Sequence, residues 1–320
     1  MKEKVLLLLK EGEYISGEKL SEILGVSRTA IWKAINSLRD DGYEIDSVTN
    51  KGYKLVKKPN VLNASTISEG LNVKVVGTEI ITLKTVDSTN EEIKRKAHEN
   101  ARSGLVVISC EQTAGKGRLG RKWASNEGGV YFSFLLRPEL PPSDVSGITL
   151  AAGLGVCLAI RKLTGLDAKI KWPNDVIVGN KKICGILTEM TAQTDMVDFV
   201  VIGIGINVLQ ESFPEEIAYK ATSLKIETKS EPDLSELMHE IIATLDKTIL
   251  SYLFGISQDD LKLYKSMCAT IGREVSLVRN GEKLTGKAVD ITADGELVVC
   301  LENGKKIAVN SGEVTVQGIY

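Results

Sequence analysis

The spacing of apolar residues changes twice along this 320-residue chain, and the changes divide it into regions with different fold patterns. Residues 1–58 show short helical periods and then a hairpin pattern, and residues 59–65 have the composition of a linker. Residues 66–268 mix strand and helix patterns, whereas residues 269–320 contain only short strand patterns. The sequence therefore predicts an α+β protein with three domains.

The last region is divided by three turn-forming pairs, Asn280-Gly281, Asp294-Gly295 and Asn303-Gly304. Such a pair between alternating apolar runs is the strongest short-range signal for a β-hairpin. Residues 269–320 are therefore expected to form a small antiparallel barrel.

The first region has the pattern of a DNA-binding helix-turn-helix. A helical apolar face ends at Gly25, and Ser27 can cap a second helix. A hairpin pattern from Tyr43 to Leu55 follows directly. A hairpin placed directly after the second helix is typical of the wing of a winged helix. We expect these side chains to face DNA: Arg28, Thr29, Trp32, Lys33, Asn36 and, in the wing, Lys51.

The alternative for this region is a small helical packing module with ordinary surface charge. Residues 1–58 hold 11 Lys and Arg against 9 Asp and Glu, a net charge of +2, which is modest for a DNA-binding module. Because topology and wing occur together, we favour a DNA reader that needs dimerisation to gain affinity.

The composition excludes several classes of site. The chain has two histidines, His98 and His239, so most His-based metal sites and nucleophile–His pairs are excluded. Its five cysteines show no Cys-x-x-Cys spacing, which is typical of reduced thiols in a cytoplasmic protein. The longest run of apolar residues and glycine, Leu150–Ile160, is too short to cross a bilayer. With a formal net charge of −2, the chemistry is expected to rest on Lys, Arg, Asp, Asn and backbone groups.

A cationic, glycine-rich loop lies between Glu111 and Trp123. Its segment Gly115–Gly120 matches the GxGxxG pattern, but no helical period follows it, so a dinucleotide-binding motif is rejected. The loop carries four basic residues and one acid. Glycines allow close approach, and arginine forks match phosphate or carboxylate oxygens, which favours a phosphate-bearing ligand that orders the loop. The alternative, a solvated surface loop, has little use for Trp123.

A second candidate site follows a strand pattern over Lys169–Val178 that Trp172-Pro173-Asn174 interrupts. Proline cannot donate to a strand ladder, so a bulge or break is predicted that re-aims Asn174 and Asp175. The next strand begins with Lys182 opposite them, and a lysine beside an aspartate can stabilise a developing anion. A plain surface hairpin explains the pattern equally well.

Two other segments have open interpretations. Ser88 and Glu91 have the spacing of a capping box, although the polar residues at this strand end can instead face a ligand. Gly203 and Gly205, in the strand pattern from Phe199, leave room for a ligand or another backbone to lie close.

Together these segments resemble the biotin protein ligases, in particular the bifunctional bacterial type that also represses the biotin operon. The resemblance covers essentially the whole chain, although the family loop usually reads Gly-Arg-Gly-Arg and position 116 here is lysine. The matching motifs are Ser88-Thr89-Asn90, the Gly115–Trp123 loop, Lys171-Trp172-Pro173-Asn174-Asp175, Lys182 with Gly185, and Gly203-Ile204-Gly205-Ile206-Asn207.

The fold that the resemblance implies is a winged helix-turn-helix over 1–58, a mixed α/β domain of the biotin/lipoate ligase type over 66–268 that binds biotin and ATP, and an SH3-like barrel over 269–320. The implied reaction has two steps. The biotin carboxylate attacks the α-phosphate of ATP, with Mg²⁺ bound to the nucleotide, to give biotinoyl-5′-AMP and pyrophosphate. A lysine of a biotin carboxyl carrier protein then attacks the mixed anhydride, and AMP leaves.

The resemblance also implies residue roles, with no protein metal site. The catalytic residues are Arg118, Asp175 and Lys182. The biotin-binding residues are Ser88, Thr89, Asn90, Gln112, Gly115, Lys116, Gly117, Arg118, Lys182, Gly185, Gly203 and Gly205. The adenylate-binding residues are Arg118, Arg121, Trp123, Lys171, Asn174, Asp175 and Asn207.

Regulation is implied as well: the adenylate acts as co-repressor, and an adenylate-bound homodimer binds two-fold operator DNA. Two alternatives stay open, a ligase for another cofactor acid such as lipoate and a ligand-sensing repressor that does not catalyse.

Overall fold

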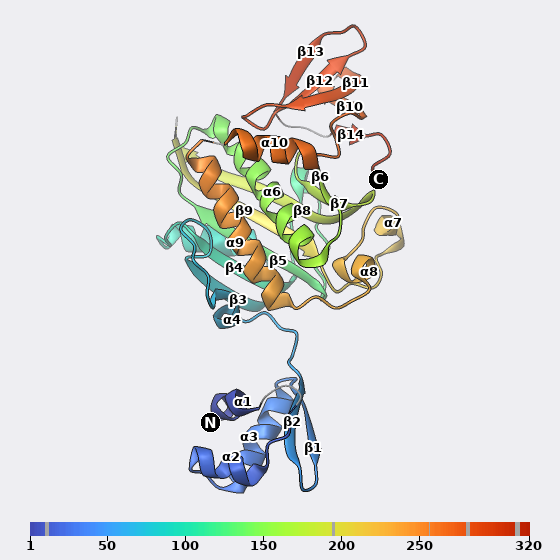
Figure 1. The fold of residues 1–320 in the computed structure, drawn as a ribbon. Coiled ribbons are helices and arrows are strands. Elements are labelled where there is room, and N and C mark those ends of the chain that lie inside the picture. The colour runs from blue at the N-terminus through green and yellow to red at the C-terminus, as the bar shows by residue number, and fades with distance from the viewer. Residues whose placement is uncertain (10–12, 194–195, 256, 280–281, 311–313) are drawn as a thin grey trace. The chain divides into compact units, whose positions relative to one another are not determined.

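The computed structural model describes residues 1–9, 13–193, 196–255, 257–279, 282–310 and 314–320. It divides into two compact units, Met1–Val61 and Leu62–Tyr320, which are described separately (Figure 1). The division falls inside the expected linker. The predicted turn Asn280-Gly281 lies outside the described residues.

The N-terminal unit is a three-helix bundle with a hairpin. Its elements are α1 (Lys2–Leu8), α2 (Gly17–Leu24), α3 (Arg28–Asp40), β1 (Glu44–Val48) and β2 (Gly52–Lys57). The Ser27 side chain caps α3 by accepting from the Ala30 amide, and Gly25 ends α2 in the left-handed conformation. Buried Ile31 and Leu38 of α3 pack in the core of this unit, so the predicted helix-turn-helix with a wing is confirmed.

A mixed seven-stranded sheet forms the centre of the second unit, in the order β3-β4-β5-β9-β8-β7-β6 among the described residues. Strands β3 and β4 are parallel, and the other neighbours are antiparallel. The strands are β3 (Glu79–Val86), β4 (Leu105–Gln112), β5 (Gly129–Leu136), β6 (Ala168–Lys171), β7 (Asp175–Val178), β8 (Lys181–Gln193) and β9 (Met196–Asn207).

Helices cover both faces of this sheet. The long helices α6 (Val145–Thr164) and α9 (Leu234–Leu253) pack together over one face, where Phe132 and Phe134 join the main core (Figure 1). Helix α5 (Thr89–His98) packs on the opposite face through a smaller cluster. The remaining helical segments are α4 (Ala64–Ser68), α7 (Glu215–Ala218), α8 (Leu224–Thr228), α10 (Gln258–Met267), η1 (Arg118–Gly120) and η2 (Pro142–Asp144).

The segment Pro142–Thr164 is long and apolar enough to cross a membrane, with a mean hydropathy of 1.6. The uninterrupted run Leu150–Ile160 therefore gave too short an estimate of the apolar segment. However, 72% of the most apolar window is buried inside the protein, so this segment contains the core helix of the unit.

The chain ends in a five-stranded antiparallel sheet, in the order β13-β12-β11-β10-β14 among the described residues. Its strands are β10 (Glu274–Arg279), β11 (Glu282–Ile291), β12 (Leu297–Leu301), β13 (Lys306–Val309) and β14 (Val314–Val316). The predicted turns at Asp294-Gly295 and Asn303-Gly304 join consecutive strands, and both glycines have positive φ, so this antiparallel module is confirmed. It is anchored to the central sheet because the Trp172 indole Nε1 donates to the Gly295 carbonyl at 2.8 Å.

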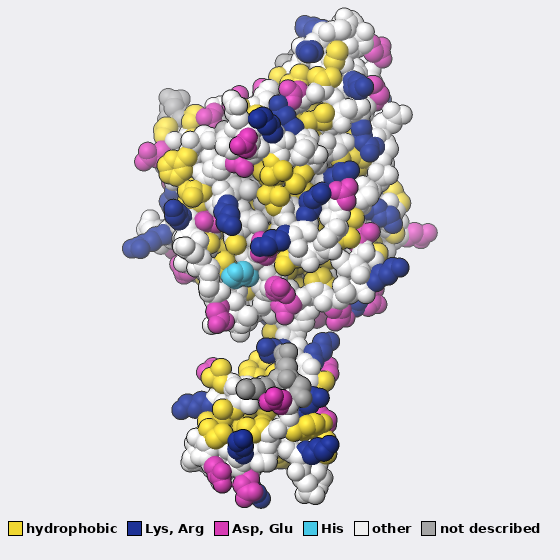
Figure 2. Space-filling view, in the orientation of Figure 1, with side chains coloured by type: hydrophobic (Ala, Val, Ile, Leu, Met, Phe, Trp, Pro, Cys, Tyr) yellow, Lys and Arg dark blue, Asp and Glu magenta, His cyan; other side chains and the backbone are white. Residues whose placement is uncertain are grey.

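Surface charge is mixed. Figure 2 shows basic and acidic side chains interspersed over the visible face of the N-terminal unit, as its small net charge implies.

Candidate active site

A cavity of about 670 Å³ lies in the second unit and collects nearly all the side chains predicted for the catalytic site. They come from the start of α5, the end of β4, the loop around η1, the β6–β7 hairpin and strands β8 and β9. The exception is Gly115, which does not line the cavity. Its carbonyl instead closes the loop by accepting from the Trp123 amide at 3.0 Å.

One end of the cavity is built from neutral polar groups. Thr89 and Asn90 are 3% and 4% exposed, and the Ser133 hydroxyl oxygen lies 2.7 Å from Thr89 Oγ1 and 2.6 Å from Asn90 Oδ1. The Gln112 carbonyl oxygen accepts from the Thr89 amide at 2.8 Å, and its amide nitrogen donates to Ser125 Oγ at 2.8 Å. These side chains are fixed by the protein itself, so this end is preformed.

The capping-box interpretation of Ser88 is wrong. Ser88 occupies the N-cap position of α5, but its side chain makes no capping hydrogen bond. Gln112, from the neighbouring strand, satisfies the first amide of the helix instead. The buried Ser88 side chain therefore belongs to the cavity lining rather than to the cap.

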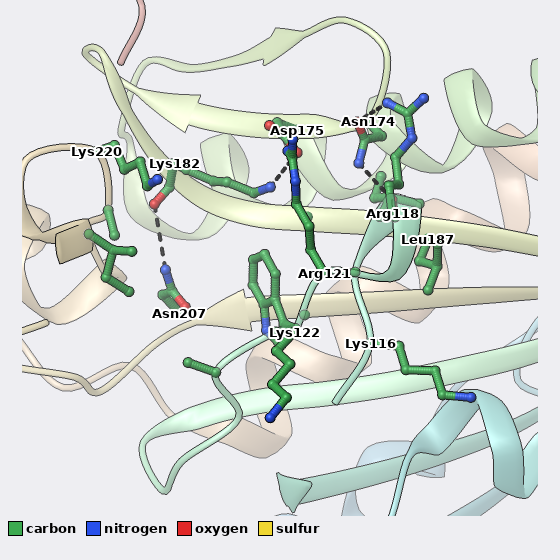
Figure 3. A pocket seen from close by; sticks show the side chains of 18 of the residues that line it. Lys116, Arg118, Arg121, Lys122, Asn174, Asp175, Lys182, Leu187, Asn207 and Lys220 are labelled. Atoms are coloured by element: carbon green, nitrogen blue, oxygen red, sulfur yellow. Dashed lines mark hydrogen bonds and ion pairs between the residues drawn. The ribbon is translucent and has the colours of Figure 1, made fainter. Parts of the chain in front are cut away.

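A chain of polar contacts leads from this neutral end to the cationic loop. Asn90 Nδ2 donates to Glu189 Oε2 at 2.7 Å, and Glu189 pairs with Lys94 at 2.8 Å. Lys94 also pairs with Glu91 at 3.0 Å, and Glu91 pairs with Lys116 of the loop at 2.7 Å. The hydrogen bonds from Lys116 and Lys94 lower the pKa of the Glu91 carboxyl. Lys116 is thus held at α5, and Figure 3 shows its side chain pointing away from Asp175.

The floor of the cavity is bare backbone at three glycines of β8 and β9. A Cβ on Gly203 would lie 2.0 Å from Asn90 Oδ1, and a Cβ on Gly205 would lie 2.6 Å from Trp123 Nε1. A Cβ on Gly185 would lie 2.8 Å from the same indole. The predicted close approach is therefore present, and side chains of this chain make it. Trp123 Nε1 is buried against the floor without a hydrogen-bond partner among the described residues.

The other end of the cavity is charged. Lys182 Nζ lies 2.5 Å from Asp175 Oδ1, with the Lys182 side chain pointing toward Asp175 (Figure 3). The strand pattern is broken at Trp172-Pro173-Asn174, as predicted. These residues form the turn of a hairpin in which β6 and β7 pair with Lys171 opposite Asp175. Trp172 is 3% exposed, so the turn is anchored in the core and the surface-hairpin alternative fails.

Basic side chains gather around this hairpin. Arg118 Nη1 donates to Asn174 Oδ1 at 3.0 Å, while Asn174 Nδ2 donates to the Ile186 carbonyl at 2.9 Å. Burial lowers the pKa of the Arg118 guanidinium, and it lowers the pKa of the Lys171 ammonium to about 8 against the opposing pull of Asp175. Arg121 lines the same cavity. This concentration of cations suits an anionic ligand.

Asn207 lines the cavity, but its side-chain amide is hydrogen-bonded within the protein. Its Nδ2 donates to the Thr222 carbonyl at 2.9 Å, and the Lys182 amide donates to the Lys220 carbonyl at 2.7 Å. These bonds tie the segment after β9 to the strand that carries Lys182.

Two parts of the cavity lining were not predicted from the sequence. One is the segment after β9, including Phe213, Tyr219 and Lys220, and the other runs from Val314 to Tyr320. The Tyr320 hydroxyl donates to Asp175 Oδ2 at 3.1 Å, a contact across 145 residues that no local pattern announces. The motif Lys171–Asp175 marked the charged end of the cavity in the sequence, but it did not indicate which distant segment contacts it.

The predicted DNA-facing residues lie on α3 and in the wing. Arg28, Thr29, Trp32, Lys33 and Lys51 are exposed, and Asn36 is half-buried. Trp32 is 54% exposed, which is unusual for a large aromatic side chain on a helix surface. Arg28 pairs with Glu18 of α2 at 3.0 Å, so one carboxylate competes with any phosphate at this position.

Comparisons with known proteins follow the same three-part division. Residues 82–207 match the Biotin/lipoate A/B protein ligase family, residues 2–54 match an HTH domain, and residues 270–316 match the Biotin protein ligase C terminal domain. The bifunctional ligase/repressor BirA of Bacillus subtilis is 40% identical, over 92% of this chain and 91% of its own. The Escherichia coli BirA is 33% identical over the same shares of the two chains.

Among solved structures, the biotin protein ligase from Aquifex aeolicus in complex with biotin and ATP aligns with a TM-score of 0.66 at 34% identity. The alignment covers 75% of this chain and 99% of that protein. The order of modules, the cavity and the extent of identity agree, and this chain belongs to the BirA family of bifunctional ligase/repressors.

Proposed function

We propose that the second unit joins biotin to a lysine of a biotin carboxyl carrier protein through biotinoyl-5′-AMP, and that the N-terminal unit binds operator DNA. The observation that carries the proposal is the two-ended cavity: a preformed neutral pocket runs directly into a cluster of cations. A ligand with a neutral ring at one end and a carboxylate that meets a nucleotide at the other fits this arrangement.

The neutral end is proposed to bind the biotin rings. Ser88, Thr89, Asn90 and Gln112 present fixed hydrogen-bonding groups, and Gly185, Gly203 and Gly205 leave the room that Asn90 and Trp123 need at the floor of the cavity. Gly115, Lys116 and Gly117 act more indirectly, by shaping the loop; only the last two of these line the cavity.

The charged end is proposed to perform the first step. Arg118 and Lys182 hold the biotin carboxylate and the α-phosphate, so that a carboxylate oxygen attacks phosphorus and pyrophosphate leaves. Reactions of this kind gain most of their rate from positioning and charge stabilisation, which needs no histidine. Lys171, Asn174, Asn207 and Arg121 are proposed to contact the nucleotide, and Trp123 packs against it.

In the second step, the carrier lysine attacks the acyl carbon of the adenylate, and the bond to AMP breaks with its electrons on the phosphate oxygen. Asp175 is proposed to orient the incoming amine, since it is the one acid among the described residues that line the cavity.

Magnesium is proposed to accompany the nucleotide. No group of three or more His, Cys, Asp or Glu side chains suited to a metal ion occurs in the described part of the chain. A carboxylate such as Asp175 is nevertheless the donor that Mg²⁺ uses when substrate phosphates supply its other ligands. When bound, the ion would neutralise phosphate charge.

The regulatory part of the proposal is a homodimer that forms when the adenylate is bound and presents two wings to a two-fold operator. The small net charge of residues 1–58 supports a reader that gains affinity by pairing. A cytoplasmic location is proposed, because all five cysteines are free in the structure.

Three measurements test these proposals. ATP–pyrophosphate exchange should depend on biotin and not on lipoate; the reverse preference would make the protein a lipoate ligase. Transfer of labelled biotin to a carrier domain should follow, and its absence would leave a sensor that does not catalyse. A DNA shift assay should show salt-sensitive binding that biotin with ATP strengthens more than either compound alone.

A further inference from the structure

Tyr320 contacts the charged end of the cavity in two ways. Its hydroxyl donates to Asp175 Oδ2 at 3.1 Å, on the side of the carboxylate away from the Lys182 contact at Oδ1. The centre of its ring lies 3.8 Å from the Lys171 ammonium. Lys171 and Asp175 face each other across the β6–β7 hairpin, so one side chain holds both ends of this pair.

The position of Tyr320 is itself well determined by the C-terminal sheet. Strand β14 pairs with β10, and the Gln317 amide donates to the Glu274 carbonyl at 3.0 Å. Ile319 is 2% exposed and fixes the chain one residue before Tyr320. The segment that leads into this sheet holds the hairpin turn, since the Trp172 amide donates to Thr270 Oγ1 at 3.0 Å.

The electrostatic setting explains what these contacts do. The Lys171 ammonium interacts with the Asp175 carboxylate and with two further ammonium groups, those of Lys182 and Lys220. Burial lowers the pKa of Lys171 to about 8. A ring face attracts a cation most strongly when the cation is desolvated. Asp175 keeps one oxygen for Lys182 and one for the phenol, so the Tyr320 hydroxyl is the donor in this hydrogen bond.

We propose that Tyr320 is a positioning residue of the adenylation site: its hydroxyl orients Asp175, and its ring holds the Lys171 ammonium where the nucleotide phosphates bind. The inference rests on the proposed ligase function. It makes the C-terminal sheet a contributor to the reaction of the central sheet, through one side chain with two separable contacts.

Two substitutions separate the contacts in the full-length protein. Tyr320→Phe removes the hydroxyl and keeps the ring, whereas Tyr320→Leu removes both and keeps apolar bulk. Tyr252→Phe is the matched control: it deletes a phenol that donates to the Asp144 carbonyl at 2.6 Å, and Tyr252 does not line the cavity. Biotin-dependent ATP–pyrophosphate exchange gives kcat and the KM for ATP and for biotin, and the melting temperature reports stability.

Tyr320→Phe should lower kcat about tenfold and leave the KM for ATP within about twofold, because it frees a charged hydrogen-bonding partner. Tyr320→Leu should in addition raise the KM for ATP about tenfold, because the cation–π contact is lost. Both variants should keep the KM for biotin, and Tyr252→Phe should match the wild type in all three parameters.

Wild-type kinetics in both Tyr320 variants would overturn the inference. Losses of activity that only follow the melting temperature, and that Tyr252→Phe shares, would overturn it as well. Failure of the proposed function is a separate result, since the wild-type protein itself would then show no biotin-dependent exchange. If exchange requires another carboxylic acid, the same comparison is made with that acid.

Discussion

The two ends of the cavity differ in how far the protein has satisfied its own groups. At the neutral end, Thr89, Asn90 and Gln112 are buried or half-buried, and each has protein hydrogen-bond partners. At the charged end, burial lowers the pKa of the Lys171 ammonium to about 8. Neighbouring cations lower this pKa further, and the Asp175 carboxylate opposes the shift. The polar groups of the neutral end therefore have their hydrogen-bond partners before ligand binds. At the charged end the cations repel one another, and a bound anion would reduce this repulsion.

This contrast teaches where rate and affinity should come from. A preformed neutral pocket contributes binding and orientation. A cluster of half-buried cations contributes stabilisation of charge that develops during reaction. Substitutions at the charged end should therefore lower kcat or ATP affinity, and substitutions at the neutral end should lower biotin affinity.

The largest expected effect is at Lys182. Lys182→Ala removes an ammonium that is 2.5 Å from Asp175 and leaves the carboxylate without this partner. Loss of one preorganised charge donor typically costs about 10²–10³ in kcat, and we expect about 10³ in biotin-dependent pyrophosphate release. DNA binding measured without ligands should be unchanged. Turnover within tenfold of the wild type would remove Lys182 from the mechanism.

The next effect tests the neutral end. Gly203→Ala places a Cβ 2.0 Å from Asn90 Oδ1, so the Asn90 amide must leave its partners. Overpacking and a lost buried hydrogen bond together cost about 2–3 kcal/mol, or roughly 100-fold in biotin affinity by calorimetry. The KM for ATP should stay within about threefold of the wild type, because the change acts at one end only.

Gly153→Ala is the matched control for that change. A Cβ there meets its nearest neighbours, in Ile170 and Ile186, at 3.8 Å, which is ordinary contact. Alanine in the helix interior should raise stability by up to about 1 kcal/mol. Equal loss of biotin affinity in both variants would contradict the assignment of Gly203 to the biotin end.

The third effect is a pH dependence at the charged end. Lys171 is protonated below its pKa of about 8, and the proposed contact with phosphate requires that form, so ATP affinity should be level below this pH and fall above it. The loss should reach about tenfold near pH 9, since an amine above its pKa loses tenfold of its charged form per pH unit. Binding titrations with ATP at a series of pH values measure it.

Lys171→Arg separates this explanation from a general pH effect, because arginine stays charged throughout this range. The fall in ATP affinity above pH 8 should disappear in the variant. An identical pH profile in both proteins would assign the dependence to another group.

The smallest effect is expected at the loop position where this chain departs from its family. Lys116 is half exposed and pairs with Glu91 on α5, and an exposed ion pair is worth about 0–1 kcal/mol. Lys116→Arg keeps the charge, so kcat and both KM values should change by less than about threefold. A larger gain or loss would place this side chain on the ligand.

The sequence was most informative where a local rule decides the structure. Ser27 and Gly25 marked the helix-turn-helix, and Gly203 and Gly205 marked a close approach, because caps and bare backbone are properties of a few adjacent residues. The cation-rich loop was likewise found from its composition, since four basic residues in so short a segment need an anion.

Contacts between distant segments escaped prediction. Gln112 replaced the expected capping role of Ser88 because β3 and β4 are neighbours in the sheet, which spacing along the chain does not reveal. The break at Trp172-Pro173-Asn174 was predicted, but its anchoring was not, because the buried Trp172 indole donates to the distant Gly295 carbonyl. The contact of Tyr320 with Asp175 was not predicted for the same reason, since the two residues are 145 positions apart.

An inhibitor that rests on Gly185, Gly203 and Gly205 would touch peptide groups, which mutation cannot exchange for another chemistry. Drug resistance at these positions requires an added side chain, and the nearest atoms of Asn90 and Trp123 already stand 2.0 to 2.8 Å from where each Cβ would lie. A substitution that escapes such a compound by changing the floor would therefore also displace Asn90 or Trp123 and deform the cavity itself.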